Sequence, residues 1–214
     1  TAMLIVRRMK TDCQINLKPF VAEFFYLGDD SNSAYGYTAR AAIDQAIYWF
    51  KLAGECEHSG GNYEYGAYLS RLKDSDGKSR LNERQMGERY VWQASNADNA
   101  DALALLGDFY FAGSAVYDVD LAYARELYAK AAAQSHPKAL AQLGKMYERG
   151  LGGPSDFDAA FRCSLQAAEA GFPQAQFHLY ALHKQKHAFV GDSASALHWL
   201  NEAAVQKYPD AMMA

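Results

Sequence analysis

The sequence repeats itself with a period of about 36 residues, and this periodicity constrains the fold more than any other feature. An Ala-Ala pair occurs at Ala131-Ala132 and returns 36 and 72 residues later. A proline keeps the same spacing, at Pro137, Pro173 and Pro209. A period in this range is typical of solenoids, in which each unit stacks on its neighbours.

A third landmark lies inside each unit. It consists of Leu-Gly, a Tyr three residues after the Gly, and a second Gly three residues later. It begins at Leu106 and again at Leu143, and at the next position, Leu179, Tyr180 replaces the first Gly. A weaker match at Tyr65 extends the pattern toward the amino terminus. The spacing indicates about five units, with the extra length in polar connectors.

Each unit is predicted to be two antiparallel helices. Proline suits the first turn of a helix, where a missing N–H costs nothing. Gly150 ends a first helix, because glycine accepts the left-handed conformation that closes it. Asp120, Asp156 and Asp192 are candidate N-caps of the second helices. The expected helices are 100–113, 121–134, 138–149, 157–170, 174–187 and 193–206.

The predicted fold is therefore all-α, a right-handed superhelix of about five antiparallel helix pairs. One pair cannot bury its own apolar face, so neighbouring units must stack. We expect a short amino-terminal segment, 1–16, followed by a single solenoid over 17–214. Its clearest units are 100–136, 137–172 and 173–208.

These landmarks resemble the Sel-one-like repeat, a relative of the tetratricopeptide repeat. The residues that carry the resemblance are Ala139, Ala141, Leu143, Gly144, Tyr147, Gly150, Ala160, Ala167, Ala168 and Gly171, with Trp199 in the following unit. The resemblance covers 100–211 and part of 17–95. Tyr180 departs from it, and so does the segment 184–191, which lacks the usual glycine turn.

The resemblance implies a non-enzymatic module that binds a protein partner. Members of the family are mostly adaptors that hold other proteins on a concave surface. Many bacterial members are exported, and some act in envelope assembly or signalling. Others are immunity proteins against secreted toxins, such as an antibacterial lipase. We expect an exported bacterial adaptor, with an immunity protein as the alternative, and no cofactor.

In such a superhelix the first helix of each unit lines the inside. One row on these helices, spaced by four, three and four residues, avoids the landmark positions. The row consists of Asp101, Leu105, Asp108, Ala112, Lys138, Gln142, Lys145, Arg149, Gln174, His178, Ala181 and Gln185. We expect an acidic stripe from the first helix of the unit 100–136 beside a basic stripe from the first helix of the unit 137–172, at the roughly 10 Å that separates packed helices. The alternative is that the row is only solvated.

Three aromatic residues near these helices add a second possibility. Phe111, Tyr117 and Tyr123 are candidate anchors for a partner, because aromatic residues dominate binding hot spots. The alternative is that they pack between units.

The three cysteines have different predicted roles. Cys163 occupies a slot that other units fill with large apolar residues, so we expect a buried thiol. Cys13 and Cys56 form a disulfide or remain two free thiols. A disulfide would indicate an oxidising compartment, most simply a bacterial periplasm with or without a lipid anchor. Free thiols would fit a cytoplasmic protein.

Other function classes find little support. The net charge of −4 and the lack of a basic segment argue against nucleic-acid binding. No apolar run approaches the ~20 residues that span a bilayer. His178, His183 and His187 lie close in sequence, but zinc needs further ligands that the spacing does not supply, so a metal-dependent hydrolase is a minor alternative. The segment 74–77 resembles a calcium loop with its glycine misplaced, and we expect a solvated connector.

Overall fold

The computed structural model describes residues 47–48, 50–52, 58–71, 81–184 and 193–213. The chain divides into two compact units, Thr1–Ala102 and Leu103–Ala214. Every regular element within the described residues is a helix, so the prediction of an all-α solenoid is confirmed. Several sequence predictions lie outside the described residues. They concern Cys13, Cys56, Gln185, His187, Asp192 and the segment 74–77.

The first unit contains α4 (Ser59–Ser70) and α5 (Leu81–Asn96). Gly66 and Gly87 lie where these helices approach most closely, and a Cβ on either would stand 2.7 Å from the other's carbonyl oxygen. The small residues at these two repeat positions are therefore required by backbone contact. Tyr65 packs beside them, with its ring centroid 5.0 Å from that of Tyr90.

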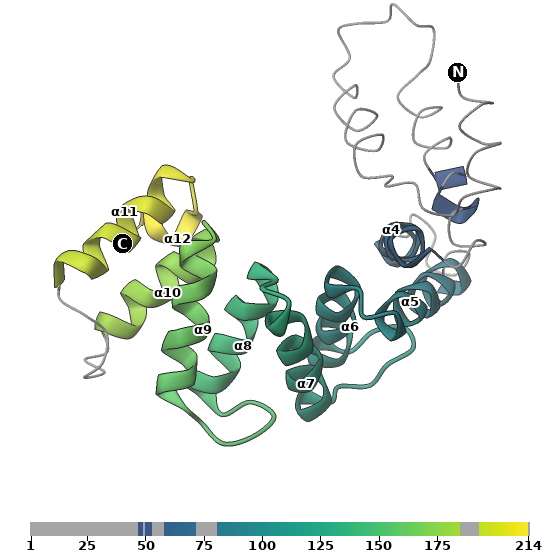
Figure 1. The fold of residues 1–214 in the computed structure, drawn as a ribbon, viewed down its shortest axis with the longest axis horizontal. Coiled ribbons are helices and arrows are strands. Elements are labelled where there is room, and N and C mark those ends of the chain that lie inside the picture. The colour runs from purple at the N-terminus through teal and green to yellow at the C-terminus, as the bar shows by residue number, and fades with distance from the viewer. Residues whose placement is uncertain (1–46, 49, 53–57, 72–80, 185–192, 214) are drawn as a thin grey trace, which may run out of the picture. The chain divides into compact units, whose positions relative to one another are not determined.

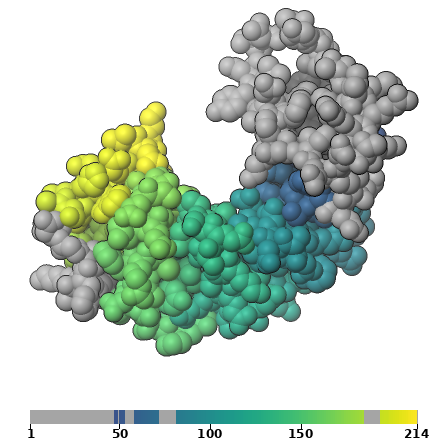
Figure 2. Space-filling view, viewed as in Figure 1, coloured from purple at the N-terminus to yellow at the C-terminus, as the bar shows by residue number. Residues whose placement is uncertain are grey.

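The boundary between the two units falls within α6 (Ala100–Ala112), and the second unit goes on along the chain with α7 (Leu121–Ala133) and α8 (Pro137–Arg149). It ends with α9 (Phe157–Glu169), α10 (Pro173–Lys184), α11 (Ser193–Val205) and α12 (Pro209–Met212). Consecutive helices from α7 to α12 pack on each other (Figure 1). Figure 2 shows α7 to α10 as one closely packed surface, coloured teal to light green. The predicted helix bounds agree with the described ones to within a few residues.

The predicted helix caps of this unit are confirmed where they are described. The side chains of Asp120 and Asp156 each accept a hydrogen bond of 2.9 Å from a backbone N–H in the first turn of the helix that follows. Gly150 ends α8 with a φ of 65°. A cap that the sequence did not predict comes from His136, whose Nδ1 accepts from the backbone N–H of Ala139 at 3.1 Å.

A left-handed residue stands two residues before each of the helices α6, α8, α10 and α12. The positions are Asp98, Ser135, Gly171 and Lys207, with φ between 53° and 80°. They are spaced by 37, 36 and 36 residues, so the conformation repeats although only one of the four residues is glycine. The left-handed backbone conformation therefore recurs at all four of these positions, whereas glycine, the residue type that usually indicates it, occurs at only one of them.

Two small residues let the paired helices of the second unit approach each other. A Cβ on Gly107 would meet the ring of Tyr128 at 2.9 Å, and one on Gly144 would meet Oγ of Ser164 at 2.6 Å. Between successive units, the buried core consists of Leu140, Ala141, Ala167, Ala168, Ala175 and Leu179. The Ala-Ala landmark thus lies in the core, where larger side chains would separate the units.

Candidate functional site

The predicted row on the first helices aligns neighbouring units through side-chain contacts. Lys138 of α8 forms an ion pair with Asp108 of α6, 30 residues earlier. Thirty residues also separate Glu148 of α8 from His178 of α10, whose Nε2 lies 3.0 Å from Oε2 of Glu148. The first helices of successive units therefore lie side by side, as the row assumed.

Asp108 is bound from two sides, so the expected charge stripes need correction. The hydroxyl of Tyr128 donates to Oδ1 of Asp108 at 2.7 Å, while Lys138 binds Oδ2. Burial, the charge of Asp108 and this hydrogen bond raise the pKa of Tyr128. Asp108 and Lys138 compensate each other's charge, because the long side chain of Lys138 reaches the carboxylate of the neighbouring helix. They do not form separate acidic and basic stripes.

Two members of the row are buried and were wrongly expected on an accessible surface. Leu105 is 9% exposed and His178 is 7% exposed. His178 lies between Glu148 and Ser164, whose Oγ is 2.8 Å from Nδ1 of the ring. Burial lowers the pKa of His178, and the hydrogen bond and charge of Glu148 oppose that shift only in part.

Serine, histidine and a carboxylate in contact invite comparison with a hydrolase triad. Ser164, however, is completely buried, and its hydroxyl also donates to the carbonyl of Ala160 at 2.7 Å. A nucleophile must reach a substrate, which this hydroxyl does not. The geometry describes a polar contact between three helices, α8, α9 and α10.

The part of the row that packing leaves available lies mainly on α8. Gln142 and Lys145 are half-buried there, and the side chain of Arg149 is 69% exposed. Burial and the nearby Arg149 lower the pKa of Lys145, against the opposing charges of Asp210 and Glu148. Gln174 of α10 is half-buried as well, and Asp101 is half-buried in the first unit.

The described residues give no metal centre. No group of three or more His, Cys, Asp or Glu within them has the geometry to hold an ion. None of the described helices has the length and apolar character to cross a bilayer. Cys163 is half-buried against the core around Leu140, and burial raises the pKa of its thiol.

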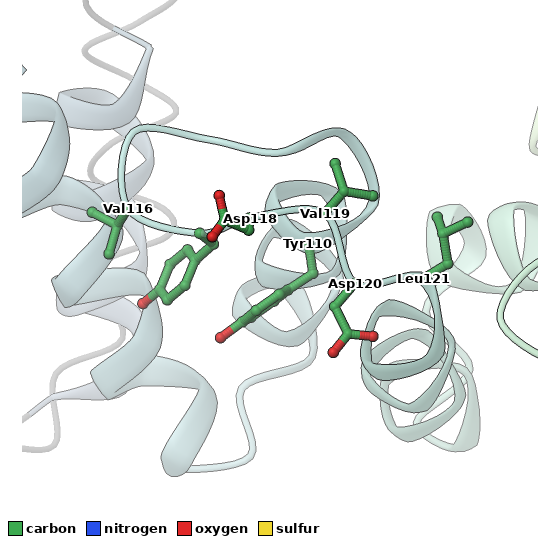
Figure 3. A pocket seen from close by; sticks show the side chains of 7 residues that line it. Tyr110, Val116, Asp118, Val119, Asp120 and Leu121 are labelled. Atoms are coloured by element: carbon green, nitrogen blue, oxygen red, sulfur yellow. The ribbon is translucent and has the colours of Figure 1, made fainter.

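A pocket that the sequence did not predict lies at the loop between α6 and α7. It is open, with a volume of about 670 Å³. Its lining residues are Tyr110, Val116, Tyr117, Asp118, Val119, Asp120 and Leu121 (Figure 3). In the figure Val116 lies at one end of the loop, and Asp120 and Leu121 lie at the other, where α7 begins.

Aromatic packing and backbone hydrogen bonds hold this pocket in shape. The Tyr110 ring centroid lies 4.7 Å from that of Tyr117 and 4.8 Å from that of Tyr123. Ser114 accepts from the backbone N–H of Tyr117 at 3.0 Å, and Asp120 N–H donates to the carbonyl of Tyr110 at 2.8 Å. The aromatic residues thus pack on each other and still line a surface, so both sequence hypotheses for them hold in part.

The pocket is acidic. Asp118 and Asp120 are exposed, and none of its seven lining residues is basic. Burial, Tyr123 and the charge of Asp120 raise the pKa of Tyr110. A negative potential of this kind favours a cationic group in contact with the tyrosine ring.

Solved structures share this fold. A Sel1 repeat protein from Oxalobacter formigenes superposes with a TM-score of 0.68 at 24% identity, over 78% of this chain and 66% of that one. The protein c5321, a protective antigen present in uropathogenic Escherichia coli strains displaying an SLR fold, gives 0.65 at 26% identity, over 77% of this chain and 34% of that one.

Two curated plant proteins match a shorter part of the chain. They are the ERAD-associated E3 ubiquitin-protein ligase components HRD3B and HRD3A of Arabidopsis thaliana. HRD3B is 38% identical over 79 residues, 37% of this chain, and HRD3A is 39% identical over 71 residues, 33% of this chain. The chain spans only 13% and 10% of their respective lengths.

The family model for the Sel1 repeat matches residues 25–58, 100–136 and 137–172, which together make up half of the 214 residues. Two of these ranges coincide with the units predicted from the sequence. The chain belongs to the Sel1 repeat family, whose members are in general non-catalytic scaffolds that bind other proteins.

Proposed function

We propose that this chain holds a protein partner against the exposed face of α8. The observation that carries the proposal is the positive charge that remains there after packing. Glu148 contacts His178 and also lies 4.0 Å from Nε of Arg149, but the side chain of Arg149 is 69% exposed, and the half-buried Lys145 adds a second positive charge on the same helix. Exposed charge of one sign steers a partner of opposite sign and sets its orientation.

Charge reversal at the most exposed of these residues tests the proposal. Arg149→Glu should weaken binding of a partner captured from the native extract by about tenfold, or about 1.4 kcal/mol. Arg162→Glu on α9 is the matched control, because Arg162 is also exposed but lies outside the row. Equal affinity of the Arg149 variant and the control for the captured partner would contradict the proposed face.

Lys145 is a poorer site for this test. Its side chain is half-buried near Glu148 and Asp210, so a reversed charge would place carboxylates together and destabilise the helix contacts. A loss of binding in a Lys145 variant would therefore mix misfolding with lost recognition.

We further propose that the protein is an exported bacterial adaptor, on the basis of the family resemblance and the cysteines. If Cys13 and Cys56 are bonded, thiol titration of the denatured chain should find one free thiol before reduction and three after it. Three thiols before reduction would favour a cytoplasmic protein.

The narrower alternative is an immunity protein. It would be favoured by a captured toxin whose activity is lost in the complex. A captured envelope protein would favour the adaptor.

A further inference from the structure

The loops that follow the first helices of two successive units differ in whether a side chain of the same chain fills them. In the unit 137–172, the guanidinium carbon of Arg125 lies 4.2 Å from the ring centroid of Tyr147. The same guanidinium donates to the carbonyl oxygen of Pro154, in the loop after α8, at 3.1 Å. An arginine from the preceding second helix thus covers the tyrosine and closes the loop.

The preceding unit places Tyr110 where the next has Tyr147, 37 residues later. Arg125 directly follows Ala124, and the residue in that position one unit earlier, after Gly87, is Glu88. A carboxylate does not replace a guanidinium on the face of a tyrosine. The repeat position that supplies Arg125 to Tyr147 therefore holds no arginine in the unit before Tyr110.

The acceptor for an arginine is nevertheless present in the earlier loop. Pro154 lies two residues before the N-cap Asp156, and Asp118 lies two residues before the N-cap Asp120. The residue at the position whose backbone carbonyl binds Arg125 is Asp118, which adds an exposed side-chain carboxylate to the pocket lining that it shares with Tyr110. A carboxylate binds a guanidinium more strongly than a carbonyl does, and in a bidentate geometry.

We propose that the pocket of Tyr110 and Asp118 binds an arginine side chain of a protein partner, flanked in the partner by apolar residues. The guanidinium would contact the tyrosine ring and pair with Asp118. Val116 and Val119, 44% and 58% exposed, would contact the flanking apolar side chains. This inference rests on the proposed protein-binding function but uses residues separate from Arg149.

The charge and the shape of the pocket indicate its occupant. The lining joins aromatic and aliphatic surface with two acids and no base, which excludes an acidic segment. The hydrogen bonds from the loop backbone to Ser114 and from Asp120 to Tyr110 keep the pocket formed without a ligand. Preformed geometry reduces the ordering cost that a short peptide must overcome on binding.

The test uses a fluorescein-labelled, end-capped peptide with a single arginine between two leucines, and the same peptide with neutral citrulline in its place. Fluorescence anisotropy of the full chain should show saturable binding of the arginine peptide below about 1 mM, and binding about tenfold weaker for the citrulline peptide. Citrulline keeps the shape of arginine and removes its charge, so the ratio isolates the guanidinium.

A pair of variants locates the binding on the protein. Asp118→Asn should weaken binding of the arginine peptide by about fivefold or more, as expected when a charged hydrogen bond becomes neutral. Asp158→Asn, the same change at an exposed acid in the first turn of α9, should leave the affinity unchanged.

Three results would overturn the proposal. They are equal binding of both peptides, no binding of the arginine peptide to the folded protein, and equal affinities of the two variants. None of them bears on the face of α8, because the peptide test does not involve Arg149. A negative peptide test therefore contradicts the arginine site alone, and it is distinguished from a negative result for the proposed partner-binding face of α8.

Discussion

The units 100–136 and 137–172 share their landmarks and differ in what those landmarks contact. Tyr147 is covered by Arg125 of the same chain, whereas Tyr110 lines an open acidic pocket. The two loops thus occupy equivalent positions in the repeat, but Arg125 covers the tyrosine of one, while the tyrosine of the other lines a pocket that a partner can enter. A repeat keeps its backbone through small and capping residues, and single changes beside them decide whether a site is filled internally or left to a partner.

The polar contacts between neighbouring helices show the same contrast. Opposite Gly107 stands Tyr128, which donates to Asp108, and opposite Gly144 stands Ser164, which contacts His178. The first contact contains an ion pair, while the second contains an imidazole whose pKa burial lowers from its ordinary value. The two contacts therefore differ in their response to hydroxyl deletion and to acid.

The largest expected effect concerns the glycines of the two loops. Gly152→Ala should destabilise the protein by about 3 kcal/mol or more, and Gly113→Ala by about 1 kcal/mol. Both residues have a positive φ, but a Cβ at Gly152 would overlap the backbone carbonyl oxygen of Leu121, whereas at Gly113 the nearest atom is a side-chain methyl carbon of Val119 at 3.3 Å. Urea unfolding of both variants measures the difference. Similar losses would mean that the loop after α8 moves freely away from α7.

A smaller effect is expected from removing the buried hydroxyls. Tyr128→Phe deletes a hydrogen bond to a carboxylate and should cost about 1.5 kcal/mol, while Ser164→Ala deletes a neutral one and should cost about 1 kcal/mol. The comparison uses the free energy of unfolding at neutral pH. A larger loss in the Ser164 variant would show that the imidazole contact is the stronger of the two.

The smallest effect is a dependence of stability on pH. Because the folded pKa of His178 lies below its ordinary value of 6.5, the unfolded chain binds more protons as the pH falls below about 6.5. The contribution of His178 to stability is therefore fully present above that pH and is lost as the pH falls toward the folded pKa. The groups that face this ring are Ser164 and Glu148, with Lys145 and Arg149 nearby.

Substitution separates this dependence from that of other groups. His178→Gln should flatten the change in unfolding free energy between pH 7.5 and pH 5, taken as rough limits around the ordinary histidine pKa. His198→Gln, at an exposed histidine of α11, should keep the slope of the native chain. Equal slopes in both variants would contradict a depressed pKa at His178.

The sequence predicted the parts of this fold that depend on short stretches of chain. Asp120, Asp156 and Gly150 act within one helical turn, so their roles follow from residue type and position. The cap at His136 was missed because histidine is an unusual N-cap. Ser135 was missed because its left-handed backbone does not require glycine.

The candidate site was less predictable, for a physical reason. Leu105 and His178 lie on the expected row, but their burial depends on how the neighbouring helices pack against them. The apolar pattern of a single helix does not show how that helix is rotated about its axis against its neighbours. The pocket at Tyr110 depends on how the loop, the tyrosine and the two acids are arranged in space, and the order of these residues along the chain does not show that arrangement.

The contrast between the filled loop and the open loop can be measured in one experiment. With 3-fluorotyrosine placed at Tyr110 or at Tyr147, fluorine NMR during titration with the arginine peptide reports which ring meets a guanidinium. The resonance at Tyr110 should shift and that at Tyr147 should not. Arg125→Ala should then make Tyr147 respond as well, because it uncovers the ring that Arg125 contacts. An unmoved Tyr110 resonance in the folded native chain, or a response at Tyr147 while Arg125 is present, would contradict an arginine site at the open loop.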